Sequence, residues 1–117
     1  MTTFADATRV LGDSGEFTWA VPDGWQQGRG AWGGLVIGAL VNAVVASEPD
    51  PSRTVRSVSI QMMAPALPVT HRVAVTRVRA GSSMTTWAVS ASAPDGEAVA
   101  NGVVITGGPR VALDEFL

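Results

Sequence analysis

One apolar segment limits what this chain can fold into more than any other feature. Residues 33–46 are almost entirely Gly, Ala, Leu, Ile and Val, and Asn42 is the one clearly polar residue among them. Apolar side chains fall on most sides of a helix drawn through the segment, which predicts a helix buried nearly all round. A membrane span needs about 20 residues, so this shorter segment is typical of a core helix.

Short stretches with strand periodicity lie on both sides of this helix. Before it, Phe17, Trp19 and Val21 alternate with other residues and lead into a Pro-Asp-Gly turn at 22–24. After it, the prolines of residues 49–51 end the helix. Period-two patterns and turns then predict four more strands, at 57–62, 70–80, 84–93 and 97–106.

The predicted order is one strand, one long apolar helix and a four-stranded antiparallel meander, with a bulge near Thr76 where the alternation breaks. Burying one large apolar side chain contributes roughly 1.5–3 kcal/mol. Exposing all those of the helix would therefore exceed the net stability of a domain, about 5–15 kcal/mol. We expect an α+β fold: a single hot-dog domain over residues 1–117, in which a curved antiparallel β-sheet wraps around the central helix. Residues 107–117 are expected to form a C-terminal tail.

Composition excludes several classes of function. The 117 residues include no cysteine and one histidine, which argues against disulfides, a Cys nucleophile, and thiolate or histidine-rich metal sites, and we expect no bound metal. The eight basic residues are scattered arginines and the net charge is −2, so nucleic acid is not an expected partner. The N-terminus contains Asp6 and lacks the apolar core of a secretory signal. We therefore expect a cytoplasmic protein without a membrane partner.

Four segments in this order resemble the TesB-like acyl-CoA thioesterases, a hot-dog family. The resemblance covers roughly Phe17 to Ile105 and matches only the N-terminal of the two hot-dog halves usual in that family. The matching segments are GRGAWGGLVIGAL (28–40) at the helix start, RSVSIQMMAPALP (56–68), VTRVRAGSSMTTWAVSAS (75–92) with its Arg-x-Gly-x-Ser pattern, and DGEAVANGVVI (95–105).

The resemblance also shows what this chain lacks. The family's catalytic Asp, Thr and Gln lie in the second half, so no residue here takes those roles. A single-domain branch of hot-dog thioesterases has His-Gly-Gly at the helix start and an acidic residue near the helix middle. Here those positions are Trp32 and Val41, the latter beside Asn42. The resemblance thus implies a scaffold and an acyl-binding helix without a recognisable general base.

The start of the helix holds the strongest candidate site. Free backbone N–H groups there favour negative charge, and those of Gly33 and Gly34 could stabilise the oxyanion of a thioester under attack. The alternative is that the two glycines only allow a tight turn into the helix. Trp32 could form a wall of an acyl pocket. Asn42 could orient a water or the thioester carbonyl, or else satisfy a buried backbone group or a dimer contact.

Four further residues are candidates for binding the substrate: Ser59, Gln61, Arg79 and Ser83. Ser59 and Gln61 could line a tunnel, although a solvated strand face is the more usual role for such residues. Arg79 could meet the phosphates of coenzyme A, with Ser83 beside it in the Arg-x-Gly-x-Ser pattern. His71 lies near a turn and is expected to be exposed, which argues against a hot-dog hydratase because that chemistry needs a histidine in the site.

We therefore predict an acyl-CoA thioesterase that acts through water, with no covalent nucleophile and no cofactor beyond the coenzyme A of its substrate. The site would form where two hot-dog units meet, in a homodimer or with a second hot-dog subunit. Gly38 and Ala39 would let another unit approach the helix closely. The alternative is a non-catalytic module that binds acyl thioesters or assembles with a catalytic subunit.

Overall fold

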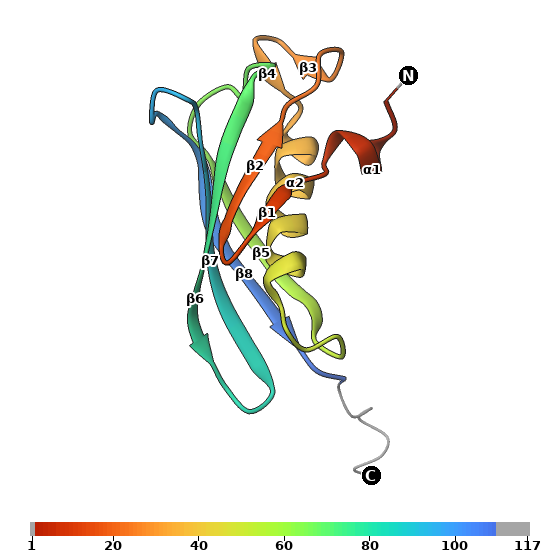
Figure 1. Cartoon of the computed structure of the whole chain (residues 1–117), viewed down its shortest axis with the longest axis vertical. Helices are drawn as coiled ribbons and strands as arrows, with labels where there is room; N and C mark the ends of the chain where they lie inside the picture. The colour runs from red at the N-terminus through yellow and green to blue at the C-terminus, as the bar shows by residue number, and fades with distance from the viewer. Residues whose placement is uncertain (1, 110–117) are drawn as a thin grey trace.

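A curved six-stranded antiparallel sheet holds one long helix on its concave side in the computed structural model, which describes residues 2–109 (Figure 1). The helix is α2 (Gly33–Ser47), and a short helix, α1 (Phe4–Ala7), precedes the sheet. A two-stranded ribbon of β3 (Gln26–Gln27) and β4 (Gly30–Ala31) leads into α2. In spatial order the sheet contains β1 (Leu11–Asp13), β2 (Glu16–Ala20), β6 (Thr70–Ala80), β7 (Met84–Ser92), β8 (Ala98–Gly107) and β5 (Thr54–Met62).

This arrangement confirms the predicted hot-dog architecture and corrects the predicted strand order. β6, β7 and β8 form a meander, and the predicted bulge near Thr76 occurs as a register shift between Arg77 and Arg79. β5 pairs with β8, however, and not with β6. The short connections after β6 and β7 make these three strands neighbours, and β2 occupies the other side of β6. The free edge of β8 is therefore the place left for β5.

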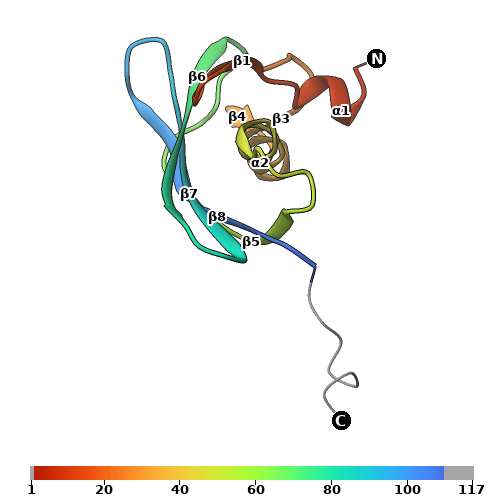
Figure 2. The ribbon, with the colours of Figure 1, turned by 60° about the horizontal axis from the view of Figure 1, so that its bottom comes forward.

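The central helix is buried on one face only, which corrects the prediction of a helix buried nearly all round. Leu35, Val36, Leu40 and Val44 are fully buried, whereas Val45 is 54% exposed. Figure 2 shows the reason: the sheet curls around one side of α2 and leaves the other side uncovered. Within residues 2–109, no helix has the length and hydrophobicity that a membrane crossing requires.

The N-terminal segment covers part of this open side of α2. The indole Nε1 of Trp19 donates to the carbonyl of Ala7 at 2.8 Å, which fixes the end of α1. Phe4 and Thr8 pack so close to Gly38 that a Cβ there would lie 2.9 and 3.0 Å from their side chains. Gly38 thus accommodates the chain's own N-terminal segment. This corrects the expectation that Gly38 receives a second unit.

Strand β5 is more exposed than its sequence pattern predicts. Its alternating pattern predicts one buried face, yet Val58 and Met62 are 40% and 42% exposed and Ser59 and Gln61 are also exposed. The strand lies at the edge of the sheet and has one neighbour, β8. A nine-residue edge strand with both faces accessible presents unpaired backbone N–H and C=O groups, which another strand could pair with.

His71 corrects the expectation of an exposed histidine, because it is 1% exposed. It faces inward on β6 opposite Trp19, and their ring centroids lie 6.0 Å apart. Its Nδ1 lies 2.9 Å from the carbonyl oxygen of Val69. Within residues 2–109, Nε2 of His71 has no hydrogen-bond partner. The predicted C-terminal tail falls mainly outside the described residues, from residue 110 onward.

Candidate functional site

The N-terminal end of α2 is fixed by backbone contacts of the preceding ribbon. The N–H of Ala31 donates to the carbonyl of Ala66, and that of Trp32 donates to the carbonyl of Trp25. Gly30 permits the close approach, since a Cβ there would lie 2.7 Å from Cα of Pro65. Trp32 then occupies the N-cap position without a capping side-chain hydrogen bond.

The first N–H groups of the helix are left free by this geometry. The carbonyl of Trp32 accepts from the N–H groups of Leu35 and Val36. Among residues 2–109, no backbone or side-chain oxygen accepts from Gly33 or Gly34. Two unpaired N–H groups at a helix start, where the helix dipole is positive, form a favourable environment for a developing oxyanion.

The two glycines differ in what surrounds them. A Cβ on Gly33 would meet nothing within 4 Å, so this position faces open space. A Cβ on Gly34 would lie 2.5–2.8 Å from the indole ring of Trp32, which is 48% exposed. Gly34 therefore makes room for the Trp32 side chain in this structure. The structure brings Trp32, Gly33 and Gly34 together at one end of α2.

Asn42 does not join this group, because it lies nine residues along the helix from Gly33, about 13 Å at 1.5 Å per residue. Its amide NH₂ donates to the carbonyl and to the hydroxyl of Thr8, at 3.0 and 3.1 Å. Thr8 is 1% exposed. The amide of Asn42 thus satisfies buried polar groups of the N-terminal segment, one of the roles weighed from the sequence.

The remaining sequence candidates lie elsewhere. Ser59 and Gln61 pair with exposed Val103 and Asn101 of β8 and share their face, which points away from α2. The end of β6 that carries Arg79, with the β6–β7 turn that carries Ser83, lies at the opposite end of the sheet from the start of α2 (Figure 1). Both of these side chains are exposed.

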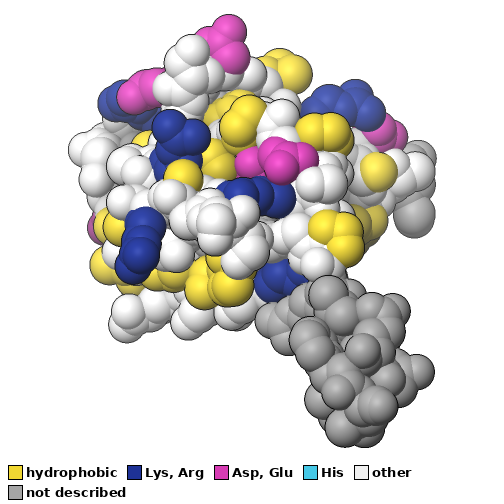
Figure 3. All heavy atoms as spheres, turned by 90° about the horizontal axis from the view of Figure 1, so that it is seen from below, with side chains coloured by type: hydrophobic (Ala, Val, Ile, Leu, Met, Phe, Trp, Pro, Cys, Tyr) yellow, Lys and Arg dark blue, Asp and Glu magenta, His cyan; other side chains and the backbone are white. Residues whose placement is uncertain are grey.

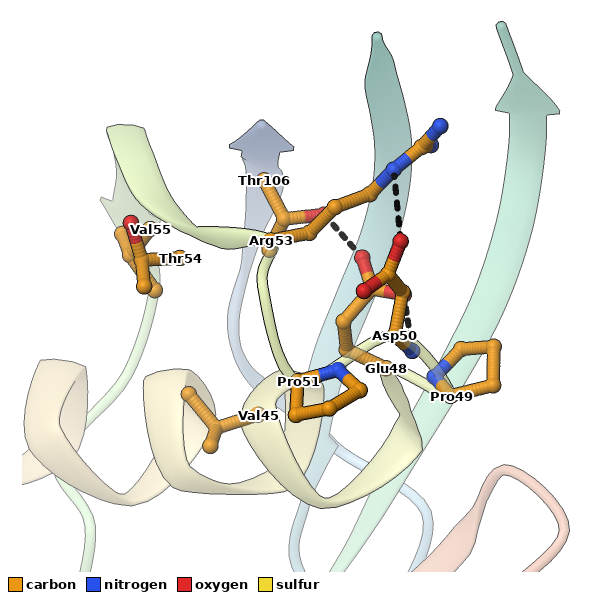
Figure 4. A pocket seen from close by; sticks show the side chains of 9 residues that line it. All are labelled: Val45, Glu48, Pro49, Asp50, Pro51, Arg53, Thr54, Val55 and Thr106. Atoms are coloured by element: carbon orange, nitrogen blue, oxygen red, sulfur yellow. Dashed lines mark hydrogen bonds and ion pairs between the residues drawn. The ribbon is translucent and has the colours of Figure 1, made fainter. Parts of the chain in front are cut away.

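A second group of polar side chains meets at the C-terminal end of α2. Trp87 donates its indole N–H to the Thr106 hydroxyl at 2.9 Å, and that hydroxyl donates to Oε1 of Glu48 at 2.5 Å. Trp87 and Thr106 are buried, and Glu48 is half-buried. Glu48 also lines a cavity of about 610 Å³ (Figure 4). This is the part of the molecule that the sequence interpretation missed.

Arg53 and Asp50 close the same end of the molecule. Arg53 donates to the Thr85 hydroxyl and to the carbonyls of Gly81 and Ser82, at 2.7–3.0 Å. Its Nε lies 3.7 Å from Oδ2 of Asp50. Hydrogen bonds from the side chain and backbone of Ser52 hold the pKa of Asp50 below its ordinary value, with a smaller contribution from Arg53.

Two weak signals in the sequence could have indicated this group. Glu48 directly follows the apolar helix, where a negative charge is unfavourable to the helix dipole and so needs donors. Thr106 lies on the same face of its strand as Val104, and that face is otherwise apolar. Each signal alone is common, and the pairing of residues 48, 87 and 106 requires the fold.

Residues 21–107 match the family model described as acyl-CoA thioesterase N-terminal domain. No curated protein sequence matches the chain. The chain is similar in structure to a conserved hot-dog protein of Alicyclobacillus acidocaldarius, with a TM-score of 0.83 and 23% identity over 93% of this chain and 40% of the other.

Two further solved structures are similar. A candidate thioesterase II of Thermobifida fusca has a TM-score of 0.80 and 20% identity, over 96% of this chain and 44% of the other. The BH2602 protein of Bacillus halodurans, solved with CoA, has a TM-score of 0.75 and 20% identity over 92% and 76%. At these identities the similarity establishes the fold. The chain spans less than half the length of the first two proteins.

Proposed function

Because the chain belongs to the family of acyl-CoA thioesterase N-terminal domains, we propose that it binds the thioester end of an acyl-CoA at the N-terminal end of α2. Together with a second hot-dog unit it hydrolyses that thioester with water. The unpaired N–H groups of Gly33 and Gly34 are the observation that carries this proposal.

The chemistry of thioester hydrolysis suits such a pair of donors. Attack of water on the carbonyl carbon places negative charge on the carbonyl oxygen, and a proton must leave the water. N–H groups fixed at a helix start can stabilise that charge without reorganising. The half-exposed side chain of Trp32 offers an apolar surface beside these N–H groups.

A second unit would supply what this helix start lacks. Trp32, Gly33 and Gly34 include no group that accepts a proton at neutral pH. The long edge of β5 offers a place for another unit to continue the sheet, and Val58 and Met62 add exposed apolar surface. We propose a homodimer joined along β5, or a second hot-dog subunit in the same position.

Association can be tested by light scattering across micromolar concentrations. Val58→Glu on β5 should shift the protein toward monomer, because the partner strand would bury the new charge. Val78→Glu is the matched control, since Val78 is 61% exposed and lies on β6. A wild-type protein that stays monomeric at every concentration contradicts the homodimer.

A non-catalytic acyl-thioester-binding or assembly module is the second candidate. The amide of Asn42, beside the helix position where a single-domain relative would place an acid, is bonded to Thr8. Binding of acyl-CoA without release of free coenzyme A would favour this candidate over the thioesterase.

A pair of substitutions at Gly33 tests the role of its N–H. Gly33→Pro removes this donor at the first helical position, where proline is well tolerated. Trp32 already has φ −54° and ψ 138°, a conformation that suits a residue before proline. Gly33→Ala is the control, because it keeps the N–H and places its Cβ in open space.

We expect Gly33→Ala to behave like the wild type and Gly33→Pro to lower turnover by about 10²–10³-fold, the usual effect of losing one oxyanion donor. A thiol reagent measures coenzyme A release, and calorimetry measures acyl-CoA binding. Equal turnover of the two folded variants would remove Gly33 from the mechanism. Absence of both turnover and binding for all acyl chain lengths would overturn the proposed function.

A further inference from the structure

The cavity at the C-terminal end of α2 has the size and lining of a ligand site. Its volume of about 610 Å³ lies within the usual range of about 300–1,000 Å³ for small-molecule sites. The end of the helix, the loop after it, the start of β5 and the end of β8 all contribute to its walls. The lining includes the polar residues Glu48 and Thr106 and the apolar residues Val45, Pro51 and Val55.

The polar centre of the cavity is the carboxylate of Glu48, which a buried chain of hydrogen bonds orients. The indole of Trp87 can only donate, so the Thr106 hydroxyl accepts from it and directs its own proton to Glu48. The N–H of Asp50 donates to the other oxygen of Glu48 at 3.2 Å. Each carboxylate oxygen then keeps acceptor capacity for a further donor.

The end of α2 adds to the negative charge of this carboxylate. The carboxylate lies at the C-terminal end of α2, where the helix dipole is negative, and the last turn contains no basic residue. Among residues 2–109, Arg53 is the one cation in the lining, and its guanidinium is engaged by Thr85, by two turn carbonyls and by Asp50. Figure 3 shows the molecule from below, and on this face acidic and basic side chains lie among hydrophobic ones.

These features select the chemistry of the ligand. A positively charged donor is favoured by Glu48 and by the helix end, and an apolar body is favoured by Val45, Pro51 and Val55. Among residues 2–109, no group of three His, Cys, Asp or Glu side chains is close enough together to hold a metal ion. An anion would face Glu48 and Asp50, and the lining within residues 2–109 offers it no cation other than the engaged Arg53.

We propose that this cavity binds a small organic ammonium ion, whose charged group donates to the Glu48 carboxylate while its apolar part packs against Val45, Pro51 and Val55. The site is separate from the thioester site, because α2 is 15 residues long and places the two at opposite ends, about 22 Å apart along its axis.

Titration with hexylammonium chloride tests the ligand class. Two-dimensional NMR spectra would follow the indole N–H of Trp87 and the backbone N–H of Thr106, which lie next to the cavity. Hexanol and sodium hexanoate are matched probes with the same apolar chain and with no charge or a negative charge. We expect hexylammonium to bind about tenfold more tightly than hexanol, the scale of one hydrogen bond to a charged group, and hexanoate to bind least.

A matched pair of variants tests the role of the carboxylate. Glu48→Gln keeps the shape and an oxygen that can accept from Thr106, but removes the charge. Glu97→Gln makes the same change at an exposed position in the turn before β8. We expect Glu48→Gln to weaken hexylammonium binding about tenfold and to leave hexanol binding unchanged, whereas Glu97→Gln changes neither.

Three results would overturn the proposal. The first is equal affinity for hexylammonium and hexanol in the wild type, which would make the cavity merely apolar. The second is equal hexylammonium affinity in Glu48→Gln and the wild type. The third is that the Trp87 and Thr106 signals move with protein concentration and not with hexylammonium, which would mean that a side chain of another copy fills the cavity. None of these results depends on acyl-CoA or on Gly33.

Discussion

The two ends of α2 differ in almost every physical respect. At the N-terminal end, N–H groups are unpaired, the nearest side chain is a half-exposed tryptophan, and Trp32, Gly33 and Gly34 carry no charge. At the C-terminal end, Glu48 is held by hydrogen bonds from a buried threonine and a backbone N–H, and a cavity lies beside it. We call the N-terminal end the open end, because its backbone donors are unpaired, and the C-terminal end the closed end, because its buried polar groups are held in hydrogen bonds that stabilise the domain.

The largest effect that tests this contrast is expected from Thr106→Val. The substitution keeps the shape but leaves the buried Trp87 indole without an acceptor and Oε1 of Glu48 without its donor. Each buried group left unsatisfied costs about 1–3 kcal/mol, so the free energy of unfolding in urea should fall by at least that amount. Thr86→Val, on the outer face of β7, is the control and should change stability little. Equal effects of the two substitutions would show that the closed end contributes nothing special.

Asn42→Ala should have an intermediate effect. It removes two hydrogen bonds to Thr8 that hold the N-terminal segment against the middle of α2. Typical hydrogen bonds contribute about 0.5–1.5 kcal/mol, and we expect a loss of this size in urea denaturation. Asn101→Ala, at an exposed position on β8, provides the comparison. If Asn42→Ala were no less stable than Asn101→Ala, the segment would not be anchored by this side chain.

Gly33→Ala should have a smaller effect of opposite sign. A Cβ at this position meets nothing, and alanine restricts the unfolded chain more than glycine does. Substitutions of this kind stabilise by about 0.4–1 kcal/mol. The midpoint of urea unfolding should therefore rise. A clear loss of stability would mean that the start of α2 is more tightly packed than its neighbours indicate, and the contrast between the two ends would weaken.

The smallest effect concerns the pH dependence at the closed end. The pKa of Asp50 lies below its ordinary value of 3.8 in the folded protein. Its ionised form therefore contributes stability above pH 3.8, and this contribution is lost as the pH falls through the lowered pKa. Ser52→Ala should raise the pKa of Asp50 toward 3.8, as an NMR titration of its carboxyl carbon would show. An unchanged titration would mean that Ser52 does not set this pKa.

The sequence predicts the open end of the helix better than the closed end, because the information is local there. Trp32, Gly33 and Gly34 are consecutive, so their meeting at the start of α2 follows from the helix alone. The hot-dog architecture also follows from one apolar segment followed by alternating strands. The first N–H groups of any helix lack a partner within the helix, so the free N–H groups of Gly33 and Gly34 follow once a helix is predicted to begin there.

The closed end could not be predicted in the same way, because its partners are far apart in the chain. Glu48 and Thr106 are 58 positions apart, and their hydrogen bond depends on β8 running past the end of α2. The strand order matters too, since an edge position for β5 exposes residues that its alternation predicts to be half-buried. The nearness of His71 to a turn predicts an exposed side chain, whereas its alternation with Val73 and Val75 predicts the buried position that it has.

The attachment of the N-terminal segment has a consequence for how this chain can vary in evolution. Trp19 and Asn42 donate to main-chain carbonyls, those of Ala7 and Thr8. Every residue type carries such a carbonyl, so single replacements at the exposed positions 5 and 6 would preserve the attachment, whereas the buried Ala7 has little room for a larger side chain. An insertion or deletion between residues 8 and 19 would shift the acceptors relative to the donors. Length should therefore vary less than residue identity in this part of the chain.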